Sequence, residues 1–269
     1  MLLGLPALLL LALFLVPLAN VVWGSLFTPH LTFSNYARMG SSSVYLNVFW
    51  QTLQIAVLTT VACIALGYPA ALFLARQNES LRNVLMLCVI VPFFLSTLVR
   101  NYIWIALLQR SGLVNRLLLE WGLISEPLPL MYNKFGVVLV MTNMLLPYTI
   151  LPILSTLLAI PSSLYDASAS LGGNALRTFV RVTLPLSLSG VAAGGLLVFI
   201  VSLGFFITPA LVGGPKQMMI SNLVDFNVRE VLNWPFAFAL ANVLLWGTLV
   251  LYFVYARLVE GRLPRAGFL

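Results

Sequence analysis

Long stretches of this chain carry no charged residue, and they constrain its fold more than any other feature. Asp, Glu, Lys and Arg are absent from residues 1–37, 39–75, 135–165, 182–215 and 231–256. A shorter uncharged run, 83–99, ends at Arg100, and apolar sequence then continues to Leu108. A membrane-spanning helix needs about 20 apolar residues, so each of the six regions can supply one.

The composition excludes a water-soluble protein. Hydrophobic residues make up 61% of the 269 residues and charged residues only 8%, whereas a soluble domain carries about 25% charged residues. Soluble enzymes, nucleic-acid-binding domains and disordered tails are therefore excluded, and the net charge of +7 comes from basic residues scattered singly between apolar runs. The runs do not alternate as the strands of a membrane β-barrel do. We predict an all-α, polytopic membrane protein with one transmembrane domain over 1–269.

Six transmembrane helices are predicted near 3–26, 48–75, 83–107, 136–158, 187–210 and 236–257. The first could be mistaken for a secretory signal, but Met1-Leu2-Leu3 provides no basic segment, so we expect a span that stays. Cys63 and Cys88 fall inside spans and His30 stands alone, which leaves a metal site without ligands.

Charge in the loops orients the chain only weakly. With six spans both termini share one side. If that side is the cytoplasm, it holds Arg76, Arg82, Arg177, Arg181, Arg257, Arg262 and Arg265. The opposite side then holds Arg38, Arg110, Arg116, Lys134, Lys216 and Arg229. Seven basic residues against six barely favour this orientation by the positive-inside rule.

The segment 159–186 has the pattern of two short helices joined by glycines. Pro161 and two serines suit a helix N-terminus, and we expect Asp166 in the first turn. Leu171-Gly172-Gly173 would stop this helix, Asn174 would cap a second one, and Leu184-Pro185 would end that. The segment is either a compact knob outside the bilayer or an interfacial helix lying on lipid.

The same segment resembles the EAA loop of type I ABC-importer permeases. Asp166-Ala167-Ser168 stands for Glu-Ala-Ala, Gly172 follows after three residues, and Val182-Thr183-Leu184-Pro185 follows after nine more. Segments across the chain, among them 66–76, 91–104 and 145–152, are similar to the spermidine/putrescine permease group. The candidate coupling residues are therefore Asp166, Ala167, Ser168, Gly172, Val182, Leu184 and Pro185.

The resemblance implies a permease subunit in the bacterial inner membrane, with 159–186 and both termini in the cytoplasm. It implies as partners two copies of an ATP-binding subunit, a second related permease, a periplasmic solute-binding protein and membrane lipid. The chain has no G-x-x-x-x-G-K-[ST] loop, so it is not an enzyme by itself, it binds no cofactor, and ATP with Mg²⁺ belongs to the partner ATPase. The long loops 27–46, 108–135 and 211–235 are expected to face the binding protein.

The cargo is the least determined feature. All seven acids are expected in loops or at span ends, although carboxylates would help a polyamine to cross. Aromatic residues are the candidate pathway, namely Tyr102, Trp104, Tyr148, Phe205 and Phe206. Such a path fits polyamines, and also opines, amino-acid derivatives or other small solutes. Arg100, the one charge well inside a span, is expected to have a structural partner on another helix.

Two other classes remain as alternatives. A secondary transporter would show matching halves with broken helices, and no such match is visible between 1–134 and 135–269. A structural membrane protein would use 159–186 only to lie on lipid.

Overall fold

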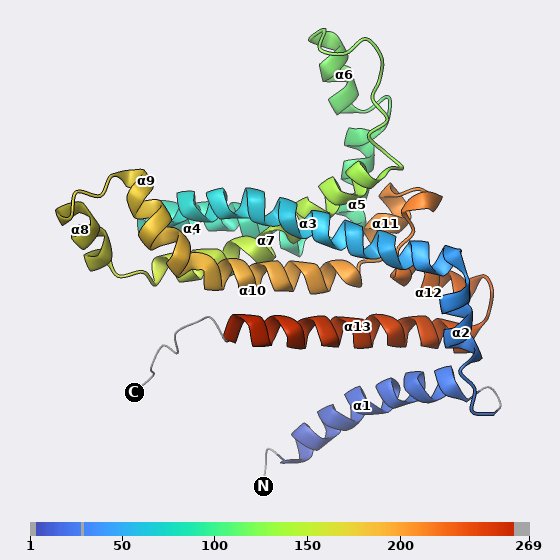
Figure 1. Ribbon diagram of the computed structural model, residues 1–269. Helices are drawn as coiled ribbons and strands as arrows, with labels where there is room; N and C mark the ends of the chain where they lie inside the picture. Colours follow the sequence, from blue (N-terminus) through green and yellow to red (C-terminus); the bar gives the residue numbers. More distant parts are fainter. Residues whose placement is uncertain (1–3, 28–29, 261–269) are drawn as a thin grey trace.

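The computed structural model describes residues 4–27 and 30–260, and the regular secondary structure of this part is helical apart from one isolated bridge between Phe27 and Leu31 (Figure 1). The all-α prediction is confirmed. The helices are α1 (Gly4–Leu26), α2 (Ser34–Ser41), α3 (Ser43–Ala75), α4 (Glu79–Ile90), η1 (Val91–Phe94), α5 (Thr97–Leu108), α6 (Leu113–Glu120), α7 (Lys134–Leu158), α8 (Ser162–Ser170), α9 (Ala175–Thr178), η2 (Phe179–Thr183), α10 (Leu184–Leu203), α11 (Ile207–Val212), η3 (Pro215–Gln217), α12 (Ile220–Arg229) and α13 (Trp234–Glu260).

Helices α3, α7 and α10 pack side by side as the centre of the molecule (Figure 1). Their close approach depends on glycines of α10. A Cβ at Gly190 would lie 2.7 Å from the Pro152 carbonyl oxygen, and one at Gly194 would lie 3.1 Å from the Thr149 Cα. Small residues let helix backbones approach within a membrane, where packing and not burial from water drives association. The glycines of α10 therefore allow α10 and α7 to pack closely in the core of the bundle.

Helix α13 forms a second layer with α1 and α12, partly separate from this bundle. A polar cluster holds the layer together inside an apolar environment. The Asn242 amide donates to Ser25 Oγ at 2.9 Å, and that hydroxyl lies 2.8 Å from the Tyr36 hydroxyl of α2. The two hydroxyls and the amide N–H thus find partners in the protein, as hydrocarbon surroundings demand, while the buried Asn242 Oδ1 has none among the described residues.

The third span, predicted as one helix over 83–107, is broken into two arms, so the prediction of a single helix is wrong. The pair of segments Glu79–Phe94 and Thr97–Glu120 is bent by 99°. Pro92 lies in the 3-10 turn η1, and Leu95 and Ser96 are extended, with ψ of 141° and 134°. Proline lacks the N–H that a continuous helix needs, which places the break here. Helices α5 and α6 consequently project from the side of the bundle (Figure 1).

The predicted fifth span is displaced along the chain. It was expected over 187–210, but α10 ends at Leu203 and α11 begins at Ile207. At the other end, Leu184-Pro185 does not end a helix as predicted, because helix continues over Ala175–Leu203. The π-helical turn η2 carries it past the proline, with the Leu184 N–H donating to the Phe179 carbonyl five residues back. A wider turn accommodates a ring that would clash in an ordinary α-helix.

The described residues contain four helices that are long and apolar enough to cross a membrane, or five if the bent pair is one span. The four include α3, α7 and α13, and the helix that runs from Ala175 through α10 to Leu203. Within α1, residues Leu11–Leu26 form an apolar helix that is shorter than these four. The polytopic membrane fold is confirmed, while the six-span count is matched only in part. The predicted loop residues Arg262 and Arg265 and the N-terminal Met1-Leu2-Leu3 lie outside the described residues.

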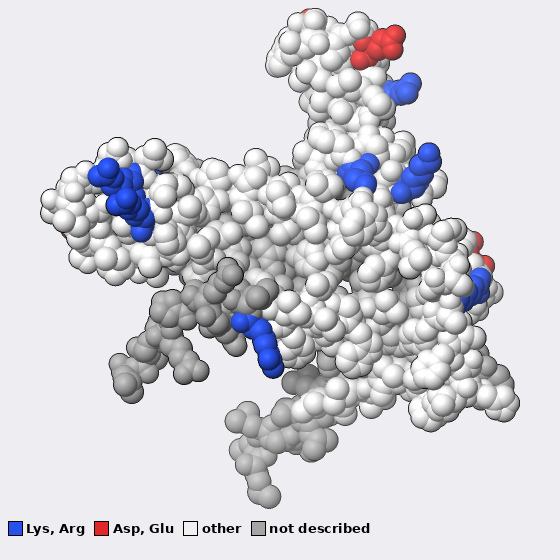
Figure 2. Space-filling view, in the orientation of Figure 1, with Lys and Arg blue, Asp and Glu red and all other residues white. Residues whose placement is uncertain are grey.

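The connections between the long helices fall at two ends. Helices α8 and α9 lie where α7 ends and α10 begins, whereas α2, α6, η3 and α12 lie where α3, α7 and α13 begin. On the face seen in Figure 2, basic side chains lie near α9, at the C-terminal end of α13 and around α5, α6 and α12, and the stretch of the bundle between these ends is uncharged. This distribution matches a protein whose middle lies in hydrocarbon.

Candidate functional site

The connection between α8 and α9 is a hinge built on glycine. Gly172 has φ of +73°, a conformation that costs other L-residues roughly 1–2 kcal/mol. Its neighbour Gly173 sits against α8, since a Cβ there would lie 2.7 Å from the Ser168 carbonyl oxygen. The Ser168 hydroxyl also lies 2.7 Å from the Thr178 hydroxyl of α9. Two glycines and one hydroxyl pair therefore fix the angle between the short helices.

One expectation for this hinge needs correction. Asp166 is not in the first turn, because α8 starts at Ser162 and its first turn holds no acid. Gly172 is favoured by its backbone angle, while a Cβ there would meet no atom of the described residues within 4 Å. The predicted cap by Asn174 is present, with its side-chain oxygen accepting from the Arg177 N–H at 2.8 Å.

The remaining candidate coupling residues lie in and after the π turn. Val182 and Leu184 are half-buried and Pro185 is exposed, on either side of the buried Thr183. Asp166 and Ala167 of α8 are exposed as well. The structure thus brings the motif residues to one end of the bundle, on a helix–glycine–helix unit.

A pocket of about 560 Å³ lies between this unit and the ends of α3 and α7. Arg76, Tyr165, Phe179 and Thr183 are among its lining residues. Residue spacing alone did not indicate this pocket, because Arg76 is far from α8 in sequence. Because α8 and α9 form part of its wall, any movement of these helices would change the shape of the pocket.

The outer surface of the hinge is apolar. Leu171 is 86% exposed and Leu176 is 71% exposed. Exposed apolar patches rimmed by polar residues are typical of protein or membrane interaction sites. Arg177 and Arg181 lie in the last turn of α9 and in η2, so this end of the molecule offers both apolar and cationic contacts.

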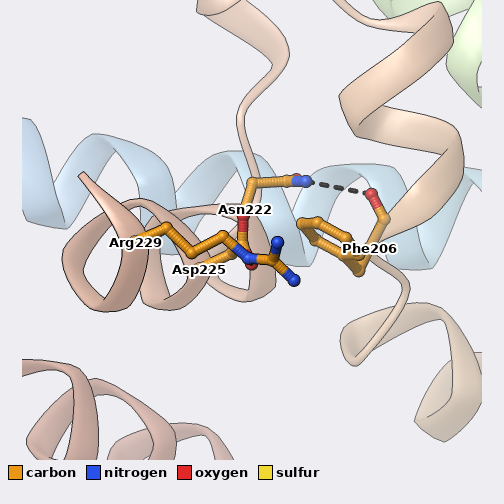
Figure 3. Close-up of polar contacts among 4 residues, drawn as sticks. All are labelled: Phe206, Asn222, Asp225 and Arg229. Atoms are coloured by element: carbon orange, nitrogen blue, oxygen red, sulfur yellow. Dashed lines mark hydrogen bonds and ion pairs between the residues drawn. The ribbon is translucent and has the colours of Figure 1, made fainter. Parts of the chain in front are cut away.

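The second candidate site is the break between α10 and α11, where two side chains of α12 bind backbone carbonyl oxygens. The Ser221 hydroxyl donates to the Phe205 carbonyl oxygen at 2.6 Å. The Asn222 amide donates to the Phe206 carbonyl oxygen at 2.9 Å (Figure 3). Irregular backbone at membrane depth needs such partners. Two side chains of α12 therefore hold the broken segment in place.

Asp225 lies one turn further along α12 and pairs with Arg229, whose Nε is 2.7 Å from the carboxylate. It is the one ion pair among the described residues. In Figure 3 the Arg229 side chain extends over Asp225 toward Phe206. Asp225 lies on a helix and not in a loop as predicted, and the Asp–Arg spacing of four with apolar Ile220 and Leu223 on one face is the pattern of an amphipathic helix.

The predicted pathway aromatics do not all lie together. The Trp104 indole N–H donates to Asn143 Oδ1 at 3.2 Å, and the Tyr148 ring meets Phe93 edge-on at a centroid distance of 4.9 Å. Trp104 and Phe205 pack against the same buried cluster, which contains Leu108 and Val140. Tyr102 is 61% exposed and takes no part in this group.

Arg100 lies in the first turn of α5, which starts the second arm of the bent segment. Its guanidinium carbon lies 6.0 Å from the Phe93 ring centroid, within reach of a cation–π interaction. Its buried Nε has no hydrogen-bond partner in the described part of the chain. The partner seen is thus an aromatic ring of the neighbouring η1, not a carboxylate on another helix. No group of residues in the described part could hold a metal ion.

Comparison with known proteins agrees with this architecture. Residues 64–263 match the model of the family described as "Binding-protein-dependent transport system inner membrane component". The spermidine/putrescine transport system permease protein PotB of Salmonella typhimurium (strain SL1344) is 32% identical over 85% of this chain and 80% of its own length. The inner membrane ABC transporter permease protein YdcU of Escherichia coli (strain K12) is 34% identical over 80% of this chain and 72% of its own length.

Solved structures share the fold. A chain of a bacterial ABC transporter involved in the import of the acidic polysaccharide alginate superposes with a TM-score of 0.81 at 18% identity, covering 97% of this chain and 94% of that one. The same kind of transporter in complex with an alginate pentasaccharide-bound periplasmic protein gives a TM-score of 0.77, covering 93% and 90%. The chain belongs to the binding-protein-dependent transport system inner membrane components, the permease subunits of ABC importers.

Proposed function

We propose that this permease imports polyamines such as putrescine and spermidine across the bacterial inner membrane. The observation that carries the proposal is the 32% identity with a spermidine/putrescine permease over 85% of the chain. Opines, amino-acid derivatives and other small solutes are the alternative cargo of the same transporter class. A molybdenum transport permease is 29% identical over 72% of the chain, so the family architecture alone does not select a cation.

The chemistry of the broken segment supports a cationic cargo. The Asp225 side chain carries a carboxylate and is 34% exposed. It lies one helical turn from Asn222, which binds the Phe206 carbonyl. An exposed i,i+4 ion pair contributes only about 0.3–0.5 kcal/mol, so an ammonium group of the cargo can displace Arg229. Trp104, Tyr148, Phe205 and Phe206 supply aromatic faces that attract cations. Weak contacts of this kind let the cargo leave again.

The energy comes from partner subunits. Two copies of an ATP-binding subunit, with ATP and Mg²⁺, act beneath the α8–α9 hinge, and a second related permease completes the pathway. The exposed Leu171 and Leu176 support such docking, since exposed apolar side chains of this kind are typical of a protein interaction site. We assign residues 159–186 and both termini to the cytoplasm. A periplasmic solute-binding protein docks at the opposite end, where α2, α6 and α12 lie.

Transport proceeds by alternating access. Closure of the ATP-binding subunits moves α8 and α9, and the continuous helix Ala175–Leu203 transmits this movement to the break at 204–206. A rigid element linking two sites is a physical route for such coupling. Arg100 acts in structure or gating, because its charge beside Phe93 would repel a polyamine that came into direct contact.

The test of the cargo is uptake of labelled spermidine by cells with and without this chain, with an opine and an amino-acid derivative as parallel labels. We expect loss of spermidine uptake alone when the chain is deleted. Loss of another solute's uptake with unchanged spermidine uptake would refute the polyamine assignment and leave the permease assignment standing.

A further inference from the structure

Arg38 is isolated from other charges in sequence, because no other charged residue occurs before Arg76. It lies on α2, with its guanidinium carbon 4.8 Å from the Phe236 ring centroid and 5.9 Å from that of Tyr45. No carboxylate is paired with it in the described part of the chain. An exposed cation on an aromatic platform is thus available to an anion.

An apolar pocket of about 240 Å³ opens beside this cation, between α2, α3, α12 and α13. Its walls include Met39, Tyr45, Phe49, Leu223, Leu240 and Val243, and none of its lining residues is charged. Tyr45 belongs both to the platform beneath Arg38 and to the pocket wall. The cation therefore lies beside the mouth of the pocket.

The pocket continues along the helices as a narrow groove. A second cavity of about 30 Å³ shares Phe49 and Val243 with it and extends to Gly247 and Leu251 of α13. Helices α3 and α13 scarcely contact each other along this line. From Val243 to Leu251 the groove follows α13 for about 12 Å at 1.5 Å per residue. It runs from the Arg38 end toward the middle of the bundle.

We propose that this groove binds one acyl chain of a membrane phospholipid whose phosphate is held by Arg38. The pocket lining is uncharged and mostly apolar, with the cation Arg38 beside its mouth, and this pairing matches a phospholipid, which joins an apolar chain to an anionic phosphate. Guanidinium and phosphate form strong charge-assisted hydrogen bonds. A bound lipid fills the space between α3 and α13 and so supports the layer that carries α12.

The experiment uses the chain with its co-purifying subunits in nanodiscs of phosphatidylethanolamine and phosphatidylglycerol. A phosphatidylglycerol with a photoreactive diazirine in its acyl chain is added, and labelled peptides are identified by mass spectrometry. We expect labels at Phe49, Val243 and Leu251. Arg38→Gln should lower this labelling about fivefold, the ratio expected for one arginine at an anionic surface.

A groove-filling variant tests the acyl site separately. A Cβ at Gly247 would meet no atom within 4 Å, so Gly247→Phe can fill the groove without a clash at its base, and labelling should be lost. Val250→Phe is the matched control, since Val250 is 59% exposed on the same helix and does not line the groove. It should label as the wild type does.

Two results would overturn the proposal. Equal labelling of the Gly247→Phe and Val250→Phe variants would mean ordinary surrounding lipid with no groove site. Cross-links from a photoreactive residue at position 243 to the second permease, in place of lipid, would assign the groove to that subunit. Thermal unfolding of each variant, measured beside the wild type, separates a lost site from a lost fold.

Discussion

The side-chain amide of Asn222 donates to the carbonyl oxygen of Phe206 at 2.9 Å, and so joins α12 to the break in the fifth span (Figure 3). The same side chain accepts from the Met219 N–H at 3.1 Å and caps α12. One residue thereby positions both the irregular backbone and the helix that carries Asp225. This connection makes the break a defined element and not a loose loop.

Asn222→Leu should uncouple the break from α12. The buried Met219 N–H would lose its acceptor, which costs roughly 1–3 kcal/mol, and the Phe206 carbonyl would keep only its bond from the Ala210 N–H. We expect a lower unfolding temperature and slower uptake. Asn227→Leu is the control, because the amide of Asn227 bonds only to the Leu223 carbonyl of its own helix. Similar uptake defects in both variants would deny Asn222 its particular role.

Asp225→Asn should weaken transport of a polyamine without affecting the fold. The exposed pair with Arg229 contributes little to stability, while its carboxylate is the proposed contact for the cargo ammonium. The KM for spermidine uptake should rise and the unfolding temperature should stay the same. Glu230→Gln removes a nearby acid at the end of α12 as a control. An unchanged KM for Asp225→Asn would remove this residue from the pathway.

Gly172→Val should abolish transport while the protein remains in the membrane. The positive φ of +73° is costly for a β-branched residue. Gly172→Asn should retain part of the activity, because asparagine tolerates this conformation. Uptake and ATP hydrolysis by the assembly, at equal membrane levels, measure the effect. Normal uptake by the valine variant would contradict the proposal that the hinge couples the ATP-binding subunits to transport.

Gly190→Leu should prevent correct packing of α10 on α7. A Cβ at this position would lie 2.7 Å from the Pro152 carbonyl and 3.0 Å from the Ile153 Cα, which are backbone atoms that cannot yield. We expect a large loss of folded protein in detergent, seen by size-exclusion chromatography. Gly247→Ala, in open space on α13, should behave as the wild type. An intact Gly190→Leu protein would contradict the described contact.

The sequence predicted features that depend on composition or on a local motif. Uncharged runs located α3, α7 and α13, since length and hydropathy suffice for a helix in lipid. The hinge at Gly172 and the cap by Asn174 followed from residue types with one strong local preference. These features need no knowledge of the neighbouring helices.

The remaining features depend on tertiary contacts. Pro92 ends a helix in this chain, whereas Pro185 is passed by a π turn, and no local pattern distinguishes the two. The break at 204–206 is held by donors from α12, a helix within the predicted loop 211–235. A partner for Arg100 on another long helix is the expectation from sequence, but the bend brings Phe93 of η1 within 6.0 Å of its guanidinium carbon.

Reconstituted transport tests the central claim most directly. The chain is assembled with its ATP-binding subunits and second permease in proteoliposomes, with ATP on the side of the hinge and loaded binding protein on the other. Labelled putrescine and spermidine should be transported only when both are present, and Gly172→Val should stop this uptake. Transport of an opine or amino-acid derivative with no transport of either polyamine, at equal saturation of the binding protein, would contradict the account.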